Sequence, residues 1–392
     1  MPAFLAAQGL LLFNAAAVLE GSYRSPGIWG AAHLLLLGLG AMVAMGAMYQ
    51  MVPVTFLVSI WSIRLGFVQF VITAAGILSL AASFFIRLDW LPVSGGLTLL
   101  GLLIFLLQMV MSMKSQKEKN ILFLFVLTAL LCLFLTIMLG LLLSISLGFG
   151  RTVFDHLAIL KSHILLGLAG WFTLLIMGFS YKLVPMFSLA HGFSMKLSRW
   201  VFGIYITGLA LSTVSFFSLT TNLFTTGLIL LFAGFTLFTV HIGQLLKKRM
   251  KKRLDKGFLF SLSSIAGGWL IHLSAAAASF FPGQEGLFGR LVYLYIFVWI
   301  TFTISGYLFK IVPVLWWTYK YSGQAGQKGT PLLKDLIRER SAVIIFTLFA
   351  VSACGIVAAF ILAHTVLFSL SQALFFAATA LFCTEVIRVL TR

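Results

Sequence analysis

Acidic residues are scarce in this 392-residue chain, which has nine Asp and Glu against 27 Lys and Arg. Charged residues of both signs make up only 9% of the sequence, whereas 61% of the residues are hydrophobic. This composition excludes a soluble domain and predicts a polytopic membrane protein. The net charge of +18 then indicates basic loops that face anionic lipid, and a nucleic-acid partner is not expected.

Cysteine is also rare, and the common catalytic motifs are absent. Cys132, Cys354 and Cys383 lie in apolar runs without a CxxC spacing. We therefore expect buried packing residues, with neither disulfides nor thiolate metal sites. The sequence has no GxxxxGK[ST] P-loop, no HExxH, no GxSxG and no paired carboxylates. ATP-driven transport, metalloprotease and serine-hydrolase activities therefore have no support.

Long apolar runs dominate what is present. A helix needs about 20 apolar residues to cross a membrane, and such runs begin near residues 3, 29, 65, 95, 121, 158, 200, 224, 257, 290, 341 and 366. We expect an all-α integral membrane protein with about twelve transmembrane helices, forming a single polytopic domain over residues 1–392. If both termini are cytoplasmic, all but five of the 27 basic residues lie at inner ends. The positive-inside rule therefore predicts this orientation, in the plasma membrane.

Three similar segments close the second, sixth and tenth predicted helices. They read GAMYQMVPV from Gly46, GFSYKLVPM from Gly178 and GYLFKIVPV from Gly306. The three glycines are 132 and 128 residues apart, which is four predicted helices each time. This spacing predicts three quasi-equivalent four-helix units, at about residues 1–119, 120–256 and 257–392. The proline of each segment is expected to end its helix at the inner surface.

Each of these three helices carries a polar ring near its outer end. His33 lies thirteen residues before the first of the three glycines, His163 fifteen before the second, and Tyr293 thirteen before the third. Polar groups at membrane depth are costly and usually functional, so these rings are the leading site candidates.

The pattern resembles the haem-copper oxidase superfamily, which includes subunit I of cytochrome c oxidase and nitric oxide reductase. The motifs H-x6-G-W-x6-G-x2-Y-x3-P from His163 and H-x6-G-x5-G-x2-Y-x3-P from His33 are similar to its histidine-bearing helices. The resemblance implies that His33 is a low-spin haem ligand and that His163 is an active-site metal ligand. The seventh and tenth predicted helices have no histidine, so the chain resembles a degenerate member without a copper site.

The resemblance implies a b-type haem near the extracytoplasmic face, with His33 and His163 as metal ligands and Tyr293 at the corresponding place in the third unit. The arginines available for the haem propionates are Arg87, Arg151 and Arg290. The implied role is handling of nitric oxide or oxygen, or respiratory assembly, rather than oxygen reduction by an enzyme.

The expected partners are membrane lipid and a respiratory-chain subunit or electron donor. One alternative is an active oxidoreductase subunit whose missing ligands come from Tyr293, His272 or a partner chain. The other alternative is a cofactor-free transporter, since internal repeats also occur in transporters.

Overall fold

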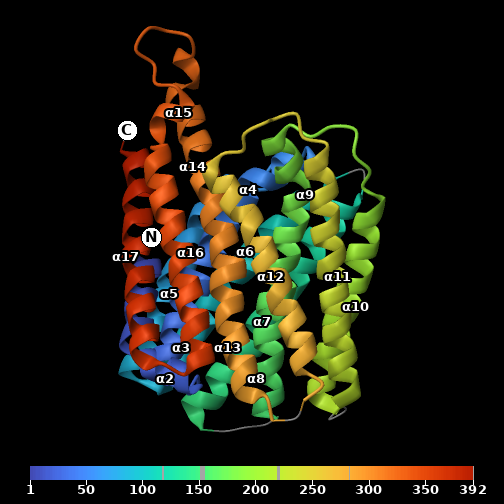
Figure 1. Ribbon diagram of the computed structural model, residues 1–392, viewed down its shortest axis with the longest axis vertical. Coiled ribbons are helices and arrows are strands. Elements are labelled where there is room, and N and C mark those ends of the chain that lie inside the picture. Colours follow the sequence, from blue (N-terminus) through green and yellow to red (C-terminus); the bar gives the residue numbers. More distant parts are fainter. Residues whose placement is uncertain (117–118, 151–154, 219–220, 282, 392) are drawn as a thin grey trace.

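The structure is a computed structural model that describes residues 1–116, 119–150, 155–218, 221–281 and 283–391 (Figure 1). Within these ranges the secondary structure is helical, apart from an isolated β-bridge between Ala190 and Arg249. Eleven helices in the described part of the chain are long and apolar enough to cross a membrane. The predicted all-α class is therefore confirmed.

The helices follow one another in a simple up-and-down order. Segments with π-helical hydrogen bonding are η1, η3 and η4, and short 3₁₀ turns are η2 and η5. The elements are α1 (Pro2–Phe13), α2 (Ala15–Glu20), α3 (Pro26–His33), η1 (Leu34–Ala41), α4 (Met42–Phe56), α5 (Ile63–Ile86), η2 (Leu88–Trp90), α6 (Leu91–Lys114), α7 (Ile121–Phe149), α8 (His156–Leu165), η3 (Leu166–Thr173), α9 (Leu174–Ser188), α10 (Lys196–Ser218), α11 (Thr221–Lys247), α12 (Lys256–Ala278), α13 (Glu285–Leu294), η4 (Tyr295–Thr301), α14 (Phe302–Tyr321), η5 (Ser322–Gln324), α15 (Leu333–Leu336), α16 (Glu339–Leu362) and α17 (Thr365–Leu390).

The two ends of the bundle differ, and we name them from Figure 1. The lower end carries α2, α8 and α13, whereas the upper end carries α4, α9 and α15. The loop that contains α15 projects beyond the rest of the upper end (Figure 1).

The first predicted span is broken. Asn14 separates α1 from α2, and its Nδ2 donates to the Leu10 carbonyl at 2.7 Å. α1 alone has 12 residues, fewer than a membrane crossing needs. A twelfth crossing made by α1 and α2 together therefore stays a prediction. α1 packs against α17, where the ring of Phe4 meets that of Phe382.

The predicted second, sixth and tenth spans share an unusual feature. Each contains a π-helical segment, at Leu34–Ala41, Leu166–Thr173 and Tyr295–Thr301. π-segments are rare and frequently mark functional sites. In each helix the segment starts within three residues of the polar ring singled out in the sequence, as expected if the three helices are equivalent. The division into three units itself stays a prediction.

Two sequence expectations are wrong. The prolines do not end their helices, because α4, α9 and α14 continue past Pro53, Pro185 and Pro313. A proline inside a membrane helix is tolerated where neighbouring groups satisfy the freed carbonyl. In addition, Cys354 is exposed on the side of α16, whereas the other two cysteines are buried as expected. Periodicity within an apolar helix does not distinguish a lipid-facing thiol from a core thiol.

α10 and α11 pack closely against each other, and glycine makes this approach possible. A Cβ at Gly208 would lie 2.6 Å from the Leu231 nitrogen, and a Cβ at Gly227 would lie 2.7 Å from the Ser212 nitrogen. Because backbone atoms cannot yield as a flexible side chain can, only small residues fit at this interface.

We expect Gly208→Ile to destabilise the protein by about 1–3 kcal/mol, because the added atoms force the two backbones apart. Unfolding in mixed detergent micelles measures the change. Gly203→Ile on the same helix is the control, because a Cβ at Gly203 meets no atom within 4 Å. Equal losses of stability in the two variants would contradict the proposed close approach.

Candidate functional site

The fold brings His33 and His163 together near the lower end of the bundle, 130 positions apart in the sequence. Their ring centroids are 6.3 Å apart and their planes are inclined by only 24°. His33 is the last residue of α3 and His163 lies near the end of α8, so each ring precedes a π-segment. The two rings are partly buried, and they form the only pair of neighbouring histidines recorded in the described part of the chain.

Hydrogen bonds fix the protonation of both rings. His33 Nδ1 lies 2.7 Å from the Trp29 carbonyl oxygen, and His163 Nδ1 lies 2.9 Å from the Thr136 carbonyl oxygen. A carbonyl oxygen has no proton to give, so each Nδ1 must be the donor. In a neutral ring the other nitrogen, Nε2, then carries a free lone pair. No hydrogen bond to either Nε2 is recorded among the described residues.

Both rings are closely packed against neighbouring elements. A Cβ at Gly140 would lie 3.0 Å from His163 Cε1, so α7 offers this ring a surface without a side chain. The His33 ring lies 5.1 Å from the Phe84 ring. Phe84 belongs to a small apolar cluster that is separate from the main core. His163 thus packs directly against the backbone of α7, and His33 packs against the ring of Phe84.

Tyr293 is engaged elsewhere. Its hydroxyl donates to Gln372 Oε1 at 2.5 Å, and Gln372 in turn donates to Gln8 Oε1 at 2.8 Å. All three side chains are buried, and they join α13, α17 and α1. The Tyr293 ring is therefore part of a buried hydrogen-bond network between these three helices.

The predicted propionate arginines have other partners. Arg290 donates to the carbonyls of Phe360 and Leu19 near the ends of two helices, at 3.1 and 3.4 Å. Arg87 forms an exposed ion pair with Asp89 at 2.6 Å. Arg151 lies outside the described residues. Neither described arginine is recorded in contact with the histidine pair, and their roles at a haem stay predictions.

His272 shares one feature with His33 and His163, the hydrogen bond from Nδ1 to a backbone carbonyl, but its Nε2 atom has a partner. Its Nδ1 donates to the Gly268 carbonyl at 2.7 Å, but its Nε2 faces the Tyr205 hydroxyl at 3.4 Å. That hydroxyl is also 3.4 Å from the hydroxyl of Tyr295, which contacts Thr173 at 2.6 Å. His272 therefore belongs to a buried hydroxyl network between α10, α12, η3 and η4.

The donor set at the histidine pair limits what it can hold. Within the described residues, no group of three His, Cys, Asp or Glu side chains is placed to bind a metal ion. A closed tetrahedral site is therefore not formed by these side chains. Two neighbouring imidazoles with unpaired Nε2 atoms would suit a metal whose remaining ligands come with it, as the four porphyrin nitrogens do for haem iron.

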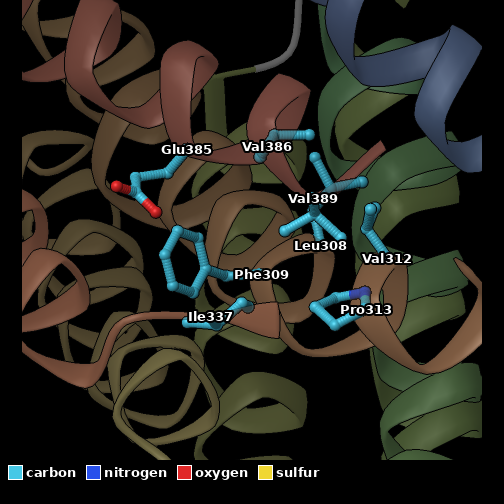
Figure 2. Close-up of a pocket in the computed structure, with 8 residues that line it drawn as sticks. All are labelled: Leu308, Phe309, Val312, Pro313, Ile337, Glu385, Val386 and Val389. Atoms are coloured by element: carbon cyan, nitrogen blue, oxygen red, sulfur yellow. The ribbon is translucent and has the colours of Figure 1, made fainter. Parts of the chain in front are cut away.

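A crevice at the upper end offers no alternative cofactor site. It is lined by Phe309, Pro313, Ile337 and Glu385, and Figure 2 shows mostly apolar side chains around it. The crevice is too narrow for a water-sized sphere. Glu385 is paired with Arg388 at 2.7 Å, as expected for a charged pair near a helix end.

No protein-family model matches the chain, and no curated protein matches it. The fold and the apolar helices define a multi-pass helical membrane protein. Its function has to be inferred from the residues themselves.

The residues that support the pair were not foreseen from the sequence. Trp29 could have been found, because it lies one helical turn before His33. Thr136 and Gly140 could not, because they act across the interface between α7 and α8, which no local pattern reports.

We expect Tyr293→Phe to destabilise the protein by about 1–3 kcal/mol, because it leaves the buried Gln372 oxygen without its donor. Unfolding in mixed micelles measures this loss. The same variant should leave any bound cofactor unchanged in amount and absorption spectrum. A changed cofactor spectrum would instead make Tyr293 part of the cofactor site.

Proposed function

We propose that this chain is a haem-binding membrane protein in which His33 and His163 would together hold one haem. The observation that supports this most is the pairing of two imidazoles whose Nδ1 protons are bound by carbonyls and whose Nε2 lone pairs are free. Metal-binding histidines almost always donate their second ring nitrogen in this way, which fixes the tautomer and orients the ring.

The separation of the rings agrees with a shared metal. Two imidazoles that both bound one metal ion through Nε2 at about 2 Å would have ring centroids up to about 6 Å apart. The observed distance is 6.3 Å, with nearly parallel planes. The proposal thus joins in one site two residues to which the family resemblance gives separate roles.

The donor set also favours one kind of haem function. A haem held by both His33 and His163 would supply one-electron transfer, because both ligand positions offered by the protein would be taken and none would be left for oxygen or nitric oxide. His33 and His163 would exclude such ligands, and the carbonyls of Trp29 and Thr136 would hold the two rings in place. Electron transfer with a respiratory partner is therefore favoured over gas handling.

The distribution of charge supports an orientation for the site. The basic run Lys247–Lys256 and the basic loop around α15 lie at the upper end, at the ends of α11 and α14. Under the positive-inside rule this end is cytoplasmic, in the plasma membrane. The histidine pair then lies toward the extracytoplasmic face, as the sequence predicts.

Reduced-minus-oxidised absorption spectra of protein purified from haem-supplied cells test the proposal. We expect about one haem per chain, iron as the bound metal, and no spectral shift with carbon monoxide, because both axial positions are filled. His33→Ala and His163→Ala should each remove the low-spin spectrum. His191→Ala is the control, because this exposed histidine lies at the upper end. A colourless wild-type protein, or a single-histidine variant with an unchanged spectrum, would contradict the proposal.

Gly140 provides a second test through the position of one ring. We expect Gly140→Val to weaken haem retention about tenfold, because its side chain displaces the His163 ring from its carbonyl partner. Haem transfer to apomyoglobin measures retention. Gly46→Val is the matched control, because a Cβ there meets nothing within 4 Å. Unchanged retention in Gly140→Val would show that α7 does not position the ring.

A further inference from the structure

A second site candidate lies at the upper end, far from the histidine pair. An open cleft of about 400 Å³ lies where α12 and α16 begin, and its lining comes from these two packed helices. The lining residues are Lys256, Glu339, Arg340, Val343 and Ile344. The cleft thus combines two cations, one carboxylate and two aliphatic side chains.

The two cations have no protein partner. Both Lys256 and Arg340 are exposed. The ion pairs recorded for the described residues include neither of them, and neither side chain has a recorded hydrogen bond. In contrast, the nearby Asp255 is held by Lys251 and Lys310 at 2.9 and 2.8 Å. Asp255 is therefore already neutralised, and the cleft itself combines two cations with the single carboxylate of Glu339.

The aliphatic part of the cleft adjoins the cations. Val343 is 45% exposed and Ile344 is 55% exposed, and both lie within the first turns of α16. Aliphatic side chains that are exposed on the side of a membrane-spanning helix face the acyl chains of the lipid. Cations immediately above such residues lie at the level of lipid headgroups, where anionic phosphate is concentrated.

We propose that this cleft binds an anionic phospholipid of the phosphatidylglycerol type. The phosphodiester would lie between the ammonium of Lys256 and the guanidinium of Arg340, which can bind two phosphate oxygens at once. The acyl chains would pack along Val343 and Ile344. Basic pockets between membrane helices bind anionic headgroups in this way.

Glu339 determines which anionic lipid fits. Its carboxylate can accept hydrogen bonds from the hydroxyls of a glycerol headgroup, because an ionised carboxylate is an acceptor only. The same carboxylate repels the additional negative charge of phosphatidic acid and the carboxylate of phosphatidylserine. A monoanionic phosphodiester with a neutral, hydroxylated headgroup therefore suits the cleft best.

Native mass spectrometry with phosphatidylglycerol, phosphatidylserine and phosphatidylcholine of identical acyl chains tests this site. We expect wild-type protein to prefer phosphatidylglycerol. Lys256→Gln and Arg340→Gln should each weaken that binding about fivefold, as expected for one cation near the headgroups. Lys256→Arg should retain binding. Glu339→Gln should bring the binding affinity for phosphatidylserine closer to that for phosphatidylglycerol.

Lys328→Gln is the matched control, because it removes an exposed upper-end cation outside the cleft. It should change binding by less than twofold. Equal binding of phosphatidylglycerol and phosphatidylcholine by the wild type would overturn the proposal, as would an equal effect of Lys328→Gln and Lys256→Gln. A thermal melt of each variant shows whether it is folded. The haem spectrum should be unchanged in all of them, so the two proposals succeed or fail separately.

Discussion

Two backbone carbonyls, those of Trp29 and Thr136, hold the Nδ1 protons of His33 and His163. In a membrane interior a ring nitrogen without a hydrogen-bond partner is energetically costly, because no water is present to take the partner's place. Because each Nδ1 already donates to a carbonyl, only Nε2 lacks a partner in each ring. The two rings lie close enough for both Nε2 lone pairs to bind one metal ion. The proposed haem site, its electron-transfer character and the importance of Gly140 all depend on this arrangement.

The predicted third helix of this kind shows another solution to the same physical problem. There a phenol stands in place of imidazole, and the Tyr293 hydroxyl donates to Gln372, which donates to Gln8. The π-segments η1, η3 and η4 follow all three rings, which indicates a shared helical design with different uses. His272, Tyr205 and Tyr295 form another closed network nearby. The buried polar groups of the described residues thus include these hydrogen-bonded networks and a pair of imidazoles whose Nε2 atoms have no recorded partner.

Much of this could be predicted from particular residues, for reasons that are physical. Apolar runs predict membrane helices because the backbone must satisfy itself in lipid. The repeated Gly-x-x-Tyr/Phe-x-x-x-Pro segments point to the three helices that contain a π-segment, while their equivalence stays a prediction. His33 and His163 were both found as candidates. Their contact was not, because it depends on how α3 and α8 lie around α7. The break at Asn14 and the continuation past Pro53 also depend on neighbours, which a local pattern does not report.

Electron paramagnetic resonance of the oxidised, purified protein tests the central claim most directly, because it reports the axial ligands of haem iron. The account predicts a low-spin ferric signal typical of two nearly parallel imidazoles, lost when either histidine is replaced. A high-spin signal from iron with an open axial position, or a low-spin signal that survives the loss of one histidine, would contradict it.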